Sequence, residues 1–144
     1  FDATSVEGER FVPQVGTLSG NPVAAAAGVA TLEVLRAPGP YDRLFDVGRT
    51  LMAALSEKLA ASGLPAQVLG EPPLFDVVFA TGEMRNYRDT KRGDTALQGR
   101  FNQLLRERGI LKSDSKYYLS TALTDEDVRQ TLDALDDALE AMKG

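Results

Sequence analysis

The chain has 144 residues, a hydrophobic content of 43% and a net charge of -5, which allow one or two small domains with a buried core. The negative charge disfavours a nucleic-acid partner, because phosphate backbones are bound by basic surfaces. No segment is long and apolar enough to cross a membrane. The sequence has neither histidine nor cysteine, so it lacks Ser-His and Cys-His nucleophiles, disulfides and the commonest metal ligands; the lack of cysteine is typical of a cytoplasmic protein.

The chain begins Phe1-Asp2-Ala3-Thr4, with neither an initiator methionine nor a signal-peptide pattern. Residues 1–13 are mixed in composition, and we expect them to form a loop. We interpret this start as a position within a larger protein, with a trimmed leader or an expression scar as the alternative.

The first predicted helix follows the sequence Gly-Thr-Leu-Ser-Gly-Asn, residues 16–21. Asn21 can cap a helix with its side-chain oxygen, and Pro22 at the first helical position loses no needed hydrogen bond. The alanines that follow predict a helix to Arg36, which Ala-Pro-Gly-Pro ends. The glycines and hydroxyls before the helix offer donors for an anion, but they match neither a P-loop nor GxGxxG, so an ordinary capped turn stays the alternative.

The middle of the chain predicts one helix, two strands and a loop. Apolar residues recur at helical spacing up to Gly63, which is a typical helix end. Two runs of β-branched and aromatic residues then predict strands, and polar residues predict a surface loop. The expected ranges are helix 41–62, strands 66–69 and 74–80, and loop 81–93.

The last part of the chain predicts a helix, two short strands and a final helix. Asp94 or Thr95 caps the first of these helices, which ends at Gly109. The final helix starts at Thr124. The acidic residues in its first turn are favourable there, because the positive end of the helix dipole attracts negative charge. The strands are expected at 110–112 and 117–121, and the apolar stripe of the final helix is Val128, Leu132, Leu135, Leu139 and Met142.

This order of elements predicts an α/β fold, in which helices pack on a sheet of three or four strands. Residues 1–36 differ, because they contain only a loop and an alanine-rich helix. We therefore predict that residues 1–36 end a larger domain and that residues 37–144 form a small α/β domain.

Three stretches of the sequence resemble one enzyme family. Residues 14–35, QVGTLSGNPVAAAAGVATLEVL, resemble the segment after the catalytic lysine in class III aminotransferases, the pyridoxal-phosphate enzymes of the type I fold. The subgroup that contains glutamate-1-semialdehyde aminomutase looks most similar. Residues 85–110 and the final helix are similar to later parts of the same subgroup, so the resemblance covers nearly the whole chain.

The resemblance implies the C-terminal part of a type I enzyme: the tail of the large domain and a small α/β domain with a short, mostly antiparallel sheet covered by helices. It implies that Thr17, with Gly16 beside it, binds the phosphate of pyridoxal 5'-phosphate across the interface of a homodimer. The family's catalytic lysine lies upstream of this motif, whereas the first lysine here is Lys58. The resemblance therefore places no catalytic residue in this chain and makes the remainder of the enzyme its partner.

One departure from the aminomutases bears on the substrate. The segment GILKSDSKYYLSTALT, residues 109–124, is shorter than theirs and carries Lys116, Tyr117 and Tyr118, where the family's substrate entrance lies. These residues favour a transaminase, with β-amino acids among its candidate substrates and a 2-oxo acid as acceptor. The alternatives are a solvated charge for Lys116 and sheet packing for the tyrosines. Two interpretations apply to four further cations. They are either solvated charges of a surface loop or residues that bind a substrate carboxylate: Arg85, Arg88, Lys91 and Arg92.

Three functions stay open at this point. The first is a piece of a dimeric transaminase, and the second is an aminomutase or amino-acid epimerase of the same fold. The third is a freestanding interaction module without catalysis. The alanine-rich helix separates them, because a freestanding module would expose the packing surface of that helix.

Overall fold

The computed structural model describes residues 16–143, and the expected loop at residues 1–13 lies outside this range. The chain divides into two compact units, Phe1–Pro38 and Gly39–Gly144. The predicted division after Arg36 lies two residues before the boundary between the units. The parts that these units play in a larger enzyme stay predictions.

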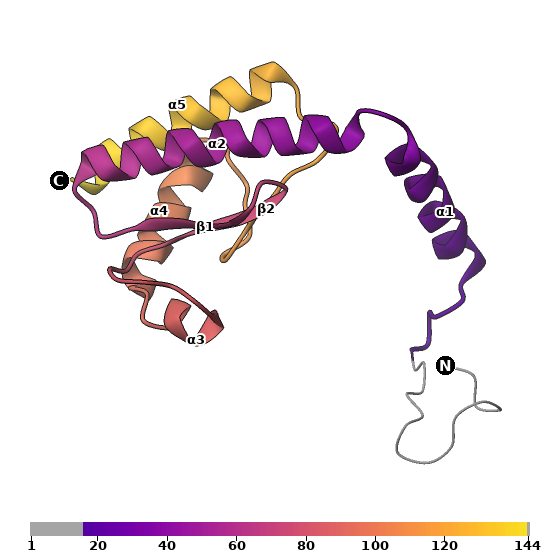
Figure 1. Ribbon diagram of the computed structural model, residues 1–144, viewed down its shortest axis with the longest axis horizontal. Helices are drawn as coiled ribbons and strands as arrows, with labels where there is room; N and C mark the ends of the chain where they lie inside the picture. Colours follow the sequence, from indigo (N-terminus) through magenta and orange to yellow (C-terminus); the bar gives the residue numbers. More distant parts are fainter. Residues whose placement is uncertain (1–15, 144) are drawn as a thin grey trace, which may run out of the picture. The chain divides into compact units, whose positions relative to one another are not determined.

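In the first unit the described residues form the helix α1, Pro22–Arg36 (Figure 1). The Asn21 side-chain oxygen accepts hydrogen bonds from Val23 N at 2.9 Å and Ala24 N at 3.2 Å, which satisfies two of the free donors at the helix start. The chain turns extended at Ala37, ahead of a proline. This confirms the predicted helix, cap and end. None of the residues in α1 is buried.

The second unit contains a three-stranded antiparallel sheet in the order β1-β2-β3. The strands β1 (Gln67–Glu71) and β2 (Leu74–Val78) form a hairpin in which Leu69 pairs with Asp76. The strand β3 (Tyr117–Tyr118) adds to the other edge of β2, where Tyr117 pairs with Phe75. The short antiparallel sheet that the sequence and the resemblance predict is therefore confirmed.

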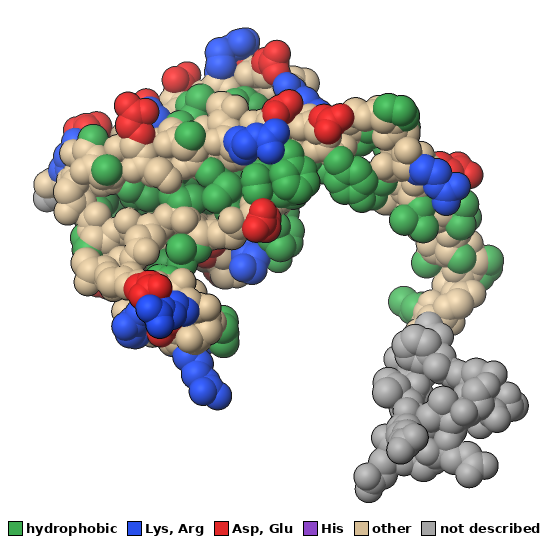
Figure 2. Space-filling model, in the orientation of Figure 1, with side chains coloured by type: hydrophobic (Ala, Val, Ile, Leu, Met, Phe, Trp, Pro, Cys, Tyr) green, Lys and Arg blue, Asp and Glu red, His purple; other side chains and the backbone are tan. Residues whose placement is uncertain are grey.

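Three long helices complete the second unit: α2 (Pro40–Ser62), α4 (Thr95–Glu107) and α5 (Asp125–Met142). In Figure 1, α2 and α5 lie side by side, and α5 also contacts α4 while α2 contacts β1. Figure 2 shows hydrophobic side chains gathered beneath α2, between this helix and the strands. The fully buried centre of this core consists of Leu55, Phe75, Val77, Phe101, Leu105, Leu135 and Ala138.

The final helix has the amphipathic arrangement that the sequence predicts. Leu135 and Leu139 of its apolar stripe are buried, and the other three members pack against the core at partial exposure. At its start, the Thr124 hydroxyl accepts from Asp127 N at 3.2 Å, while the Asp127 carboxylate accepts from Thr124 N at 2.7 Å. These reciprocal bonds are a capping box, and they fix the first turn of the helix.

One glycine sets how closely α2 approaches the hairpin. A Cβ on Gly48 would lie 2.1 Å from Pro72 O, so only hydrogen fits between the helix and the β1–β2 turn. Helix and hairpin are thus held at a separation that no other residue type allows at this position.

Three local predictions differ from the structure. Residues 110–112 do not form a strand, because Ile110 N donates to Leu105 O at 2.9 Å and closes the end of α4 instead of joining the sheet. The next expected strand is only Tyr117–Tyr118, with the bond from Leu119 N to Pro73 O beyond it. The expected loop 81–93 contains a short helix, α3 (Tyr87–Thr90), which a capping box at Asn86 starts.

Candidate functional site

The predicted phosphate-binding residues form a double turn directly before α1. Ser19 N donates to Gly16 O at 3.0 Å, and Asn21 N donates to Leu18 O at 3.1 Å. Gly20 has a φ of 75°, a conformation that favours glycine. Thr17 lies in the first turn and is exposed. The chain therefore presents the Thr17 hydroxyl next to the positive end of a helix dipole, with α1 carrying no acidic residue in its first turn. The amides of Ser19 and Asn21 donate within the turn itself.

The residues predicted to meet the substrate, Lys116 and Tyr117, belong to the second unit, whereas Gly16 and Thr17 belong to the first. Within the second unit the two predicted residues have different surroundings, since Lys116 is exposed and Tyr117 is buried.

Lys116 lies at a cavity of about 580 Å³ in the second unit. The cavity opens beside β2, the start of α4, the short helix α3 and the segment that precedes β3. It combines an apolar floor with charged groups of both signs, so it suits a small molecule that carries an apolar body and charged ends. Its lining includes Leu69, Val78, Tyr87, Asp76, Asp94 and Lys116.

Tyr117 packs in the sheet and does not line this cavity. Its ring stacks on Phe75 with centroids 4.8 Å apart and planes at 11°, and the residue is 5% exposed. Burial raises the pKa of its hydroxyl, which has no hydrogen-bond partner within residues 16–143. These contacts fit the packing alternative for Tyr117, while the neighbouring Tyr118 is exposed. A substrate contact for Tyr117 stays a prediction.

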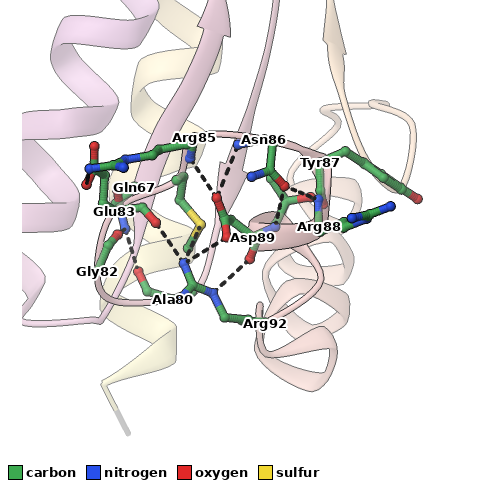
Figure 3. A network of polar contacts seen from close by, with 12 residues as sticks. Gln67, Ala80, Gly82, Glu83, Arg85, Asn86, Tyr87, Arg88, Asp89 and Arg92 are labelled. Carbon is green, nitrogen blue, oxygen red and sulfur yellow. Dashed lines mark hydrogen bonds and ion pairs between the residues drawn. The ribbon is translucent and has the colours of Figure 1, made fainter.

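One of the four cations of residues 85–92, Arg92, forms several bonds within its own segment. Arg92 Nη2 donates to Glu83 O at 2.7 Å, and its Nε donates to Asp89 O at 3.3 Å. Asp89 Oδ2 in turn accepts from Arg85 N at 2.9 Å (Figure 3). Arg92 therefore ties this segment together. Lys91 lies over the ring of Tyr87 at 4.7 Å, beside the cavity.

A buried polar cluster that the sequence reading missed lies behind the cavity. The Lys112 ammonium donates to Asn102 Oδ1 and to Ser113 O, both at 2.8 Å, and lies 3.6 Å from Asp76 Oδ1. Asn102 is 2% exposed and Lys112 is 8% exposed. The available signal was an acid within the apolar run Leu74-Phe75-Asp76-Val77-Val78, where strand alternation places it on the face opposite Phe75 and Val77.

Burial shifts both ionisable groups of this cluster toward their neutral forms. Burial raises the pKa of Asp76 to about 6, although the charge of Lys112 opposes the shift. Burial also lowers the pKa of Lys112, and the charge of Asp76 opposes that shift. Asp76 Oδ1 has no hydrogen-bond partner among residues 16–143, so one of its oxygens depends on the nearby ammonium alone.

No family model matches the chain. Among curated proteins, it is 46% identical over 132 residues to a glutamate-1-semialdehyde 2,1-aminomutase of Thermus thermophilus. That alignment covers 89% of this chain and 31% of the relative.

Among solved structures, the chain matches an omega-transaminase from Sphaerobacter thermophilus with a TM-score of 0.81 and 32% identity, over 100% of this chain and 33% of the other. The chain is homologous to the C-terminal region of class III aminotransferases. It spans about a third of the length of the relatives it matches. The homology confirms the family resemblance and the α/β fold of this region.

Two further solved structures are similar to this chain. A beta-phenylalanine aminotransferase from Variovorax paradoxus matches with a TM-score of 0.77 and 27% identity, over 90% of this chain and 30% of the other. A transaminase with PLP bound matches with a TM-score of 0.74 at 24% identity, over 90% of this chain and 30% of the other, which supports the fold alone. None of the helices within residues 16–143 could span a membrane.

Proposed function

We propose that this chain is the C-terminal part of a pyridoxal-phosphate-dependent aminotransferase that moves an amino group between an amino acid and a 2-oxo acid. The observation that carries the proposal is the double turn at Gly16–Asn21, which leads into α1 in a homologue of class III aminotransferases. That turn supplies donors at the one place where the family resemblance calls for an anion site.

The residues of the turn fit a phosphate group. Thr17 brings an exposed hydroxyl, which can donate to a phosphate oxygen, and it precedes the positive end of α1. The sequence has no acidic residue from Gly16 to Leu32, so no carboxylate of this stretch would repel the anion. When bound, pyridoxal phosphate supplies an electron-withdrawing ring that stabilises negative charge on the carbon next to the transferred amine.

In this proposal the chain binds and orients, and the lysine that moves protons lies in the remainder of the enzyme. Lys58, the first lysine here, sits on α2 and forms an ion pair with Asp136 of α5. That pair gives Lys58 a structural role within the second unit. Thr17 and Gly16 would hold a cofactor that is shared with the partner subunit of a cytoplasmic homodimer.

The cavity beside Lys116 supports a carboxylated substrate, for which β-amino acids are the first candidates. The Lys116 ammonium would receive the carboxylate, while the apolar side chains of Leu69 and Val78 would face the body of the substrate. The beta-phenylalanine activity of one structural relative is in line with this choice.

A second candidate is glutamate-1-semialdehyde aminomutase, which the identity to the Thermus thermophilus protein favours. The two activities differ in product, because the aminomutase shifts an amine within one molecule and needs no 2-oxo acid acceptor. An epimerase of the same fold would change only the configuration of its substrate. The freestanding module is the least favoured function, since α1 exposes Val23, Val29, Leu32 and Val34.

The test is made on the complete polypeptide that contains this chain. We expect it to bind pyridoxal phosphate with a visible absorbance band and to transfer the amine of a β-amino acid to a 2-oxo acid. Isomerisation of glutamate-1-semialdehyde without an acceptor would establish the second candidate instead. A colourless protein that has neither activity would refute both.

The phosphate-binding role has its own variant. Thr17→Ala is expected to weaken cofactor affinity about tenfold, because a hydrogen bond to a charged group is lost. Thr17→Ser keeps the hydroxyl and serves as the matched control. Turnover at saturating cofactor should change little in either variant, and unchanged affinity in Thr17→Ala would contradict the role.

A further inference from the structure

The segment Ser113–Lys116 forms one edge of the cavity, and two buried side chains hold its backbone. Asn102 Nδ2 donates to Asp114 O at 2.8 Å, and Lys112 Nζ donates to Ser113 O at 2.8 Å. The same ammonium donates to Asn102 Oδ1 at 2.8 Å, so the two bonds that reach the segment are joined. The bond between Asn102 and Lys112 is buried, and the two bonds that reach the segment are partly buried.

A second set of bonds links this anchor to the residue at the cavity. Ser113 Oγ accepts from Lys116 N and donates to Lys116 O, both at 2.9 Å. A displacement of the Ser113 backbone is therefore passed to the backbone of Lys116. The side chain of Lys116 is exposed and lines the cavity. Its position therefore depends on the hydrogen bonds that Ser113 forms with Lys116 and Lys112.

The Lys112 ammonium is itself fixed from two further sides. Asp76 Oδ1 of β2 lies 3.6 Å away, and the ring of Tyr117 lies at 5.0 Å from the ammonium. A buried ammonium is costly to desolvate, and an apolar side chain of similar length would fill the space without that cost. An apolar side chain, however, has no hydrogen-bond donor for Ser113 O or for Asn102 Oδ1.

We propose that Lys112 is a positioning residue: its buried ammonium, acting through Ser113 and Asn102, fixes the segment Ser113–Lys116 and so sets where the Lys116 ammonium meets a substrate carboxylate. The inference rests on the proposed function for the role of Lys116. Lys112 itself touches no substrate, since it acts from within the core through the backbone of the segment.

The main test is Lys112→Met in the complete enzyme, which keeps the length of the side chain and removes the donor. We expect KM for a β-amino acid to rise about tenfold with kcat little changed, because the position of Lys116 is no longer held. KM for the matching amine without a carboxylate should stay within about twofold. Hydrogen exchange of the backbone amides at residues 113–117 should become faster.

Lys58→Met is the matched control. It also removes a lysine from an ion pair, but that pair joins α2 to α5 and does not reach the cavity. We expect this variant to leave both KM values and the exchange at residues 113–117 unchanged. A rise in exchange in both variants would mean general loosening and would overturn the inference.

A second variant covers the case in which Lys112→Met does not fold. Asn102→Asp keeps an oxygen for the Lys112 ammonium and replaces the donor to Asp114 O with an acceptor. It should raise exchange at residues 113–117 and raise KM for the β-amino acid more than KM for the amine. Equal changes for the two substrates, or unchanged exchange, would refute a positioning role.

The exchange measurement separates this inference from the proposed function. If the unsubstituted enzyme transfers no amine, the proposed function fails, while faster exchange in Lys112→Met still supports the anchoring of the segment. If the enzyme is active and exchange is unchanged in Lys112→Met, the inference fails and the proposed function stands.

Discussion

The helices α1 and α5 form for different physical reasons. The 15 residues of α1 include no buried side chain, yet Asn21, Pro22 and a run of alanines specify the helix locally. The 18 residues of α5 carry an apolar stripe, of which Leu135 is fully buried and Leu139 nearly so. Capping and helix propensity therefore specify α1, whereas burial of its apolar stripe in the core stabilises α5.

The two helices also differ in whether their own unit buries their apolar residues. The second unit buries a continuous apolar core, as an independent domain does, although Leu111, Tyr87 and Tyr118 remain exposed. In α1 the apolar residues Val23, Val29 and Leu32 are not covered by the described residues of the first unit. An exposed apolar surface of this kind is typical of a segment that packs against further protein, which fits the role proposed for α1.

The largest expected effect is the loss of a core leucine. Leu135→Ala should lower the free energy of unfolding of the 144-residue chain by about 3 kcal/mol, because it leaves a cavity in a fully buried position. Leu32→Ala, at a residue 62% exposed on α1, should change it by less than about 0.5 kcal/mol. Urea unfolding followed by circular dichroism measures both.

The substitutions at Leu135 and Leu32 can also be compared in the complete enzyme. If α1 packs against the remainder of the protein there, Leu32→Ala should become destabilising only in that context. Equal effects of the two substitutions in the 144-residue chain would show that α1 is buried in solution, and the contrast would be wrong.

A pair of glycines should respond with opposite signs to the same substitution. Gly48→Ala places a Cβ 2.1 Å from Pro72 O, and we expect a loss of about 2 kcal/mol in the free energy of unfolding, despite the better helix propensity of alanine. Gly28→Ala meets nothing within 4 Å and should raise the helicity of α1, with a gain of up to about 1 kcal/mol. Thermal unfolding and far-ultraviolet circular dichroism measure these changes. A stabilising Gly48→Ala would contradict the close approach of α2 to the hairpin.

The sequence predicted the elements whose signals are local. The cap at Asn21, the stop at Gly63 and the stripe of α5 each lie within one element, so a short window contains all the information. The short helix α3 also had a local signal, since Asn86 and Asp89 have the spacing of a capping box. Four residues give too little apolar periodicity for this signal to stand out in a polar loop.

The rest depended on contacts between distant residues. Ile110-Leu111-Lys112 has strand-forming composition, yet Lys112 takes its partners from α4 and lies near β2. Lys112 and Asp76 lie far apart in the sequence, so no short stretch contains both. The sequence around Lys112 alone therefore does not distinguish a buried lysine from a solvated one. Gly16 and Thr17 were found through the family motif, and their role stays a prediction because their proposed ligand and partner subunit lie outside this chain.

The smallest expected effect concerns Asp76, a half-buried carboxyl in the second unit. Since its pKa is raised from 3.8 to about 6, the folded protein binds more protons than the unfolded chain between these values, and stability falls as the pH rises from 4 to 6. Over this range the unsubstituted chain should lose about 1 kcal/mol relative to Asp76→Asn, a modest figure because solvent screens part of the charge. Urea unfolding at several pH values measures the difference, with Glu33→Gln on exposed α1 as the matched control. Parallel pH profiles for the chain and Asp76→Asn would show that the Asp76 carboxyl is no more buried than the side chains of α1.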